Sequence, residues 1–369
     1  MINGDRIKQA RELRGLTQRK LADSIETTQP TIAQIEKGFI PPNENILQRI
    51  VLKTGFPLSF FKQPTSIDFP HGSLLFRARA SLTSRERNIA RQYARLIFEM
   101  ANKMEENFRE IPSNLPRLDD DILGSAIQTR SSFGLSPDLP IINLINILEK
   151  NGVMIIPLPI NLENHDAFSA WVRNDKHRPV IVLSDDLAPG DRLRFSVAHE
   201  IGHLVMHQAM RKDVKIIEDE ADQFAAEFLM PKKVMLKEII SPVTLASLIP
   251  LKQKWKVSIQ ALILRAHDLD IITQRQYKYL MQQIAVRGWR LKEPVEIARE
   301  KPRMISLMAE LLYGIPINYK SLASNTNLSS QLVQEIIGTY LVKENQGGSS
   351  QNSNATLLKF KKIDAVGDQ

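Results

Sequence analysis

The chain has 369 residues, enough for two or three domains with hydrophobic cores, and its 43% hydrophobic and 24% charged residues are ordinary for a soluble globular protein. The absence of cysteine excludes disulfides and cysteine metal ligands. Because no apolar run approaches the ~20 residues of a membrane span and the start does not resemble a signal peptide, we expect a cytoplasmic protein with no membrane partner. A formal net charge of +8 favours a polyanionic partner, most simply nucleic acid.

The first 60 residues have the pattern of a small helical domain. Helices are expected over residues 6–14, 18–25, 28–36 and 46–52, with Gly15 and Gly38 as stops and Thr17 as a cap. Short helices with a turn between the second and third are the geometry of a helix-turn-helix, in which the third helix enters the major groove of DNA.

The motifs of this region resemble the Cro/C1-type (XRE) helix-turn-helix family. They are Leu16-Thr17-Gln18-x-x-Leu21-Ala22 and Thr31-Ile32-x-x-Ile35-Glu36-x-Gly38. The resemblance implies a double-stranded DNA operator as partner, with Gln18 at a phosphate and Gln29, Thr31 and Gln34 facing base edges. It places Thr28, at the start of the third helix, at the same interface. The alternative is a helix-turn-helix that serves only in docking or dimerisation.

Two residues depart from the XRE pattern. Glu26 stands at the turn position that glycine usually holds, and Thr27 follows it where an apolar residue is usual. We therefore expect a strained or slightly remodelled turn between the second and third helices.

The middle of the chain predicts a connector, a long helix and a small sheet. Residues 62–83 are an irregular connector, residues 84–108 a long charged helix, and Pro112, Pro116 and the acidic residues 119–121 mark a boundary. A short helix over residues 141–150 precedes strands at 153–157, 168–172 and 179–183. An open edge of such a sheet can bind an extended peptide, although the pattern does not say which strand forms the edge. His165 and His177, in the loops, are either oxyanion stabilisers or plain surface histidines.

The run over residues 194–207 carries the strongest chemical signal. His199 and His203 stand four residues apart, so on a helix they project from one face and can hold one tetrahedral Zn²⁺. Glu200 between them is placed to act as the general base on a water at the metal. His207 lies about 12 Å along a continuous helix from His199, too far to share the ion, and is expected to be a helix-end or packing residue.

A third ligand must be His, Asp or Glu, and the helix expected over residues 217–230 supplies carboxylates. Glu218 shares the inward stripe of that helix with Ala221 and Asp222, whereas Glu220 lies on the edge expected to be solvated. The pattern thus favours Glu218 as ligand, Asp222 as the group that orients a ligand histidine, and Glu220 as the fallback ligand.

These two stretches resemble the ImmA/IrrE family of zinc metallopeptidases. The residues are Arg192-Leu193-Arg194-Phe195-Ser196-Val197-Ala198-His199-Glu200-Ile201-Gly202-His203 and Glu218-x-Glu220-Ala221-x-x-Phe224-Ala225-Ala226-x-x-Leu229-Met230-Pro231. The resemblance implies His199, His203 and Glu218 as metal ligands, Glu200 as catalytic base, and a partner repressor as the protein that is cleaved.

Together these patterns predict a mostly helical α+β protein of five parts. They are a helix-turn-helix domain at 1–62, a connector and long helix at 63–115, an ImmA/IrrE-like zinc peptidase domain at 116–240, a helical domain at 241–343 and a flexible tail at 344–369. No internal repeat is visible. The predicted function is a DNA-binding regulator whose zinc endopeptidase domain cleaves a partner repressor. A non-catalytic regulator that senses a ligand or metal, an antitoxin-like partner-binding protein and a homodimeric assembly all stay open.

Overall fold

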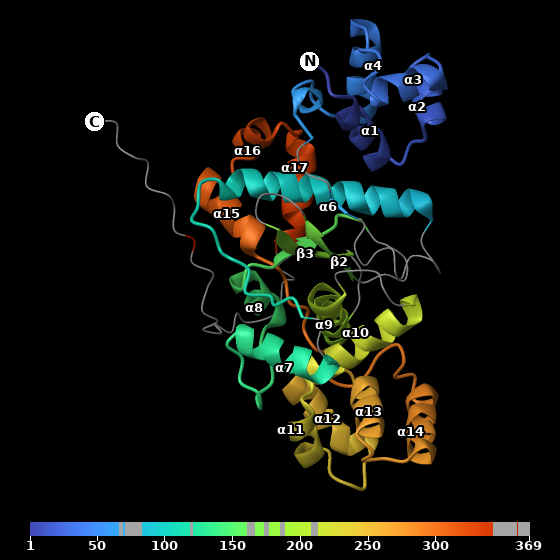
Figure 1. The fold of residues 1–369 in the computed structure, drawn as a ribbon, viewed down its shortest axis with the longest axis vertical. Helices are drawn as coiled ribbons and strands as arrows, with labels where there is room; N and C mark the ends of the chain where they lie inside the picture. The colour runs from blue at the N-terminus through green and yellow to red at the C-terminus, as the bar shows by residue number, and fades with distance from the viewer. Residues whose placement is uncertain are drawn as a thin grey trace, which may run out of the picture.

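The chain folds around a small central sheet with helices on both of its faces (Figure 1). A computed structural model describes residues 1–65, 69–70, 83–118, 121–160, 167–172, 177–184, 189–207, 213–341 and 360. The strands are β1 (Met154–Pro157), β2 (Ala167–Val172) and β3 (Arg178–Leu183), in the order β1-β3-β2, with β1 parallel and β2 antiparallel to β3. The predicted mostly helical α+β class and the three predicted strands are confirmed.

The sheet separates two hydrophobic cores because successive side chains point to opposite faces. Met154 and Ile156 of β1 belong to one core, and Ile155 between them belongs to the other. Val182 and Ile181 of β3 divide in the same way. The site described below lies on the face that carries Ile155 and Ile181.

The first core joins the N-terminal helices, one long helix and the last three helices to the sheet. These elements are α1 (Gly4–Leu13), α2 (Gln18–Ser24), α3 (Gln29–Glu36), α4 (Glu44–Thr54), η1 (Phe60–Lys62), α6 (Ser84–Glu105), α15 (Met304–Tyr313), α16 (Tyr319–Thr326) and α17 (Ser330–Tyr340). In Figure 1 α6 runs across the top of the sheet, between it and α1–α4.

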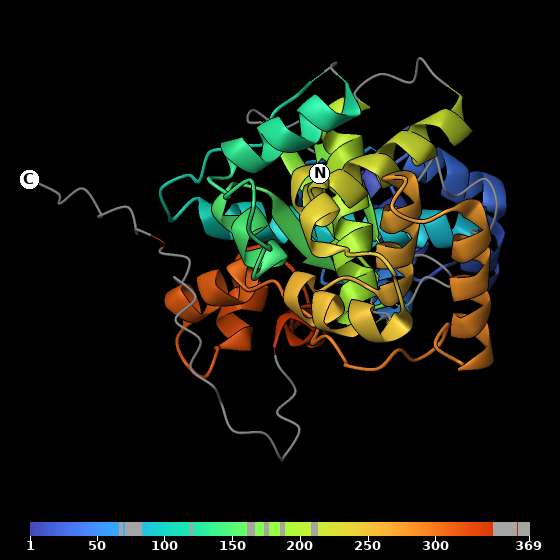
Figure 2. The same cartoon turned by 90° about the horizontal axis from the view of Figure 1, so that it is seen from below.

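The second core lies under the other face of the sheet. Its helices are α7 (Ile122–Ser132), α8 (Leu144–Lys150), α9 (Gly190–Met206), α10 (Val214–Leu229), α11 (Lys232–Glu238), α12 (Leu245–Trp255), α13 (Ile259–Asp268) and α14 (Gln274–Val286). Figure 2 views the molecule from this side, with α11–α14 in front. The helices after residue 241 therefore contribute to both cores. Within the described residues, no helix is long and apolar enough to cross a membrane.

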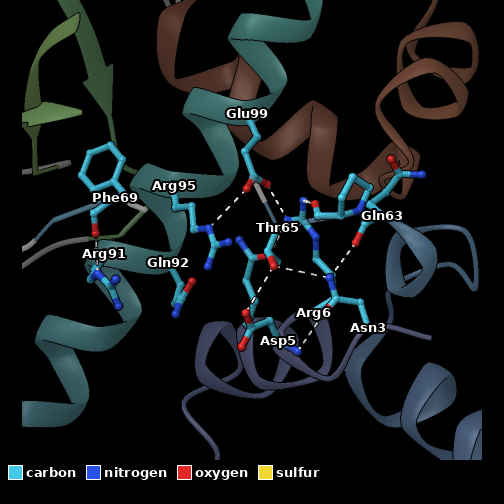
Figure 3. Close-up of polar contacts among 12 residues, drawn as sticks. Asn3, Asp5, Arg6, Gln63, Thr65, Phe69, Arg91, Gln92, Arg95 and Glu99 are labelled. Atoms are coloured by element: carbon cyan, nitrogen blue, oxygen red, sulfur yellow. Dashed lines mark hydrogen bonds and ion pairs between the residues drawn. The ribbon is translucent and has the colours of Figure 1, made fainter. Parts of the chain in front are cut away.

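A polar seam fixes α1 to α6 (Figure 3). Arg6, only 6% exposed, donates to the Glu99 carboxylate and, through Nη2, to the Pro64 carbonyl at 2.7 Å. Arg95 donates to the same carboxylate at 3.2 Å. Breaking a largely buried ion pair leaves an uncompensated charge, so this seam resists separation of the N-terminal helices from α6.

The turn between α2 and α3 places a non-glycine residue in the left-handed region of backbone conformation. Glu26 has a left-handed φ of 56°, a conformation that costs a non-glycine residue roughly 1–2 kcal/mol. Arg49 donates to the Ile25 carbonyl at 2.9 Å and to the Glu26 carboxylate at 2.6 Å. The turn is thus strained, as the substitution for glycine predicts, and Arg49 holds it through these two hydrogen bonds.

The C-terminal helices α15–α17 have the same lengths and spacing, to within a few residues, as the N-terminal helices α1–α3. Asn327 between α16 and α17 has a φ of 57°, and Ser329 caps α17 as Thr28 caps α3. The equivalent positions are 301 residues apart in both cases (26 to 327, 28 to 329). The sequence hides this repeat because spacing and backbone conformation are shared while most side chains differ.

A buried carboxylate ties α8 to the start of α15. Glu149 is 1% exposed and accepts the backbone N–H groups of Arg303 at 3.1 Å and Met304 at 2.9 Å. Burial raises the pKa of Glu149 to about 7 from the usual 4.5, against the opposing effect of these two hydrogen bonds.

This raised pKa predicts a pH-dependent stability. Because folding favours the protonated Glu149, its contribution is fully present below pH ~4.5 and is lost as the pH rises through about 7. We expect the free energy of unfolding of the wild type to fall by about 2 to 3 kcal/mol relative to Glu149→Gln between pH 5 and pH 8. Denaturant titrations of both proteins at the two pH values measure the difference, and parallel pH profiles would contradict the assignment.

Candidate metal centre and DNA-reading helix

Helix α9 buries the histidine pair and the glutamate between it. His199 and Glu200 are 0% exposed and His203 is 4% exposed, so all three face the interior between α9, α10 and the sheet. The helix ends at Met206, and His207 occupies its C-cap.

Helix α10 approaches α9 closely at Gly202. A Cβ added to Gly202 would lie 3.2 Å from the Phe224 ring and 3.3 Å from the Ala221 Cα, tighter than ordinary van der Waals contact. The missing side chain therefore allows the close packing that places Glu218, one turn before Ala221, opposite the two histidines.

Three donor atoms converge between the two helices. The Nε2 atoms of His199 and His203 are 2.9 Å apart, and the Glu218 carboxylate lies 3.5 Å from the first and 3.3 Å from the second. Bond lengths of 2.0–2.1 Å at a tetrahedral zinc ion give ligand separations of about 3.3 Å. Imidazole nitrogens with a carboxylate are also a usual zinc ligand set, so both the spacing and the chemistry of these residues fit a metal ion.

The electrostatics of the cluster suit a cation. Burial raises the pKa of Glu218, but the closeness of His199 and His203 lowers that pKa more, so it lies well below its usual value. Asp222 lies 2.6 Å from Nδ1 of His199. A carboxylate at Nδ1 holds the proton there and leaves the Nε2 lone pair toward the cluster.

Glu200 has a partner that the sequence reasoning missed. The Ser169 hydroxyl on β2 donates to Oε2 of Glu200 at 2.8 Å. Next along β2, the Trp171 ring nitrogen donates to the Leu204 carbonyl at 2.8 Å. In the sequence, Ser169 is visible only as a lone serine within an apolar strand. Its contact with Glu200 depends on how β2 packs against α9, which the sequence does not show.

Glu220 lies differently from the sequence expectation, whereas His207 lies at the end of α9, as expected. Glu220 was expected at a solvated edge, but its side chain is 19% exposed and its carboxylate lies 3.0 Å from Nε2 of His207. Nδ1 of His207 lies 3.0 Å from Nδ1 of His203. The C-cap position turns the His207 ring back toward α10, a contact that helix periodicity within α10 alone cannot predict.

Of the two loop histidines, His177 lies within the described residues and is not part of this cluster. His177 is exposed just before β3. His165, the tail at 344–369 except residue 360, and most of the connector after residue 65 lie outside the described residues.

The residues expected to contact DNA lie on α2 and α3. Gln29 and Gln34 are exposed, and Thr28 caps α3 by accepting the backbone N–H of Thr31 at 3.3 Å. Gln18 bridges the two helices: it donates to the buried Glu36 at 2.7 Å and accepts from Gln29 at 2.8 Å. These bonds hold the side-chain amides of Gln18, at the start of α2, and Gln29, at the start of α3, in fixed positions.

Comparisons with known proteins agree with the two motifs. Residues 148–267 match the family model described as IrrE N-terminal-like domain, and residues 7–61 match the model described as Helix-turn-helix. The chain joins a helix-turn-helix domain to an IrrE-like domain. The predicted fusion of these two families is confirmed, and the candidate metal centre lies within the IrrE-like domain.

The other comparisons add little. No curated protein matches the chain significantly. Among solved structures, the crystal structure of Bacillus thuringiensis PlcR in complex with the peptide PapR7 and DNA is 14% identical, over 91% of this chain and 95% of that chain. The TM-score of 0.16 is too low for this likeness to carry any argument.

Proposed function

We propose that the protein is a DNA-binding regulator whose IrrE-like domain is a zinc endopeptidase acting on a partner repressor. The observation that carries the peptidase proposal is the convergence of His199, His203 and Glu218 on one point, with the buried Glu200 adjacent on the same helix. This set combines metal ligands with a general base in the spacing that metallopeptidases use.

Each residue has a distinct role in this proposal. His199, His203 and Glu218 hold Zn²⁺, which when bound polarises the scissile carbonyl and makes water a stronger nucleophile. Glu200 takes the proton of the attacking water and passes it to the leaving amine. The Ser169 hydroxyl orients the Glu200 carboxylate, at 2.8 Å.

Strand β2 is the candidate support for the substrate. It lies at the edge of the sheet beside α9, so an extended peptide added to it would pass the metal centre. Ala167 to Ala170 are each 3% exposed or less, so residues that now bury β2 must move before a peptide binds. This burial favours a second candidate function, a regulator in which the IrrE-like domain senses a ligand or metal without turnover.

A cleavage assay tests the peptidase proposal. The purified full chain, loaded with zinc, is incubated with repressors encoded near its gene, and the products are identified by mass spectrometry. We expect one defined cut in a single repressor, suppressed by a chelator and restored by added zinc. Intact repressors together with stoichiometric zinc binding would favour the sensing function.

The helix-turn-helix domain is proposed to bind a double-stranded DNA operator through α3. The exposed amides of Gln29 and Gln34 suit base edges, and Gln18 at the start of α2 suits a phosphate. Thr28 and Thr31, whose hydroxyls are 2.8 Å apart, complete the candidate interface.

Loss of the two amides is expected to weaken operator binding. We expect Gln29→Ala with Gln34→Ala to cost about 1–3 kcal/mol per lost base contact for a selected operator, with little change for random DNA. Fluorescence anisotropy at fixed salt measures both, and Gln48→Ala on α4 is the matched control. Unchanged operator affinity would remove α3 from base recognition and favour a docking role.

A further inference from the structure

A hydrogen-bonded chain leads from His203 away from the candidate metal site. Nδ1 of His203 lies 3.0 Å from Nδ1 of His207, and Nε2 of His207 lies 3.0 Å from the Glu220 carboxylate. The His207 side chain is 4% exposed and that of Glu220 is 19% exposed, so these hydrogen bonds are largely shielded from water.

The order of donors and acceptors in this chain is determined by its carboxylate end. An ionised carboxylate only accepts, so Nε2 of His207 carries the proton that Glu220 receives. Nδ1 of the neutral His207 ring then accepts, and Nδ1 of His203 must donate to it. This leaves Nε2 of His203 unprotonated, and that atom faces the Nε2 of His199 at 2.9 Å.

The two ligand histidines thus reach the same protonation pattern by different routes. His199 has a carboxylate directly at Nδ1, that of Asp222 at 2.6 Å, whose side chain is 59% exposed. Nδ1 of His203 reaches the Glu220 carboxylate through His207. The indirect route is the more buried of the two, and burial strengthens hydrogen bonds.

We propose that His207 and Glu220 are positioning residues that hold His203 in its metal-binding tautomer and orientation. The inference rests on the metal site of the proposed function. In this proposal Glu220 supports the ligand His203 through His207 and is not itself a ligand. His207 contacts a ligand and does not bind the metal.

Two substitutions at His207 separate an acceptor role from simple packing. His207→Leu removes the acceptor, whereas His207→Asn keeps an oxygen near the position of Nδ1. We expect His207→Leu to lower zinc affinity about 10- to 100-fold and His207→Asn to recover most of it. His267→Leu, which removes a histidine from α13, is the matched control. Competition with a chromophoric chelator measures the affinities.

A second readout needs no metal. Long-range ¹⁵N–¹H correlation spectra of the histidine rings in the metal-free full chain report which nitrogen of His203 carries the proton. We expect Nδ1 in the wild type and in His207→Asn, and a mixture of Nδ1 and Nε2 in His207→Leu. Glu220→Ala, at a less buried position, is the second variant should His207→Leu fail to fold, and we expect about 10-fold weaker zinc binding.

The possible results distinguish this inference from the proposed function. Wild-type zinc affinity and an unchanged His203 tautomer in His207→Leu, or in Glu220→Ala, would overturn the positioning role. A wild-type chain that binds no zinc, yet shows the expected tautomers, would overturn the metal site and leave the hydrogen-bonded chain standing. Stoichiometric zinc without cleavage would overturn only the peptidase reaction.

Discussion

Glu200→Gln is expected to abolish detectable cleavage of the partner repressor while the protein still binds zinc and operator DNA. Loss of a positioned general base typically costs 10²–10⁴-fold in rate, about 3 to 5 kcal/mol of transition-state stabilisation. The change should leave the fold intact because glutamine has the same shape, and its amide oxygen still accepts the hydrogen bond that Ser169 now donates at 2.8 Å. Rates of product formation and bound zinc are measured on the same preparations.

Asp219→Asn is the control for this experiment. Asp219 is exposed on α10 beside Glu218, so the substitution removes one negative charge near the site without altering a buried contact. We expect it to keep the wild-type rate. Cleavage by Glu200→Gln at that rate would exclude Glu200 as the base, and unchanged gene regulation in cells that carry Glu200→Gln would favour the sensing function.

Glu218→Ala is expected to lower zinc affinity by more than the roughly 10- to 100-fold that loss of a supporting partner costs, because it removes a ligand atom. Two histidines on one helix would remain, one ligand fewer than catalytic zinc sites use. Chelator competition and the metal content of dialysed protein measure the effect. Cleavage should fall in parallel.

Substitution of Glu218 and of Glu220, the two candidate carboxylate ligands, is expected to change zinc binding to different extents. Glu220 reaches the cluster through His207, so Glu220→Ala should retain stoichiometric zinc at weakened affinity. Asp219→Asn should bind zinc as the wild type does. A greater loss in Glu220→Ala than in Glu218→Ala would reverse the ligand assignment.

Local patterns were sufficient for much of the fold. The strands follow from short apolar runs bounded by turn residues, and the second helix from its cap Thr17, whose side chain accepts the backbone N–H of Lys20. Helix periodicity did not separate Glu218 from Glu220 by burial, because their side chains are 23% and 19% exposed, and Glu220 is covered by its contact with His207 from another helix.

Contacts between elements distant in sequence were beyond that reasoning. The Ser169 hydroxyl reaches Glu200 across 31 residues, and Glu220 reaches His207 across 13. Glu149 acquires its raised pKa from burial against a helix that begins more than 150 residues later. The two residues of each pair lie on different elements, so the periodicity of one helix or strand cannot predict their contact.

The sequence by itself determined the two family motifs, the α+β class and the pairing of His199 with His203, since each depends on neighbours within about one turn of helix. Only the tertiary structure decided which face of the sheet holds the candidate metal centre, which strands lie at the edges of the sheet, and which groups contact Glu200 and His203. Those outcomes depend on how α9 packs against α10 and β2, and packing is a property of surfaces that meet only after the chain has folded.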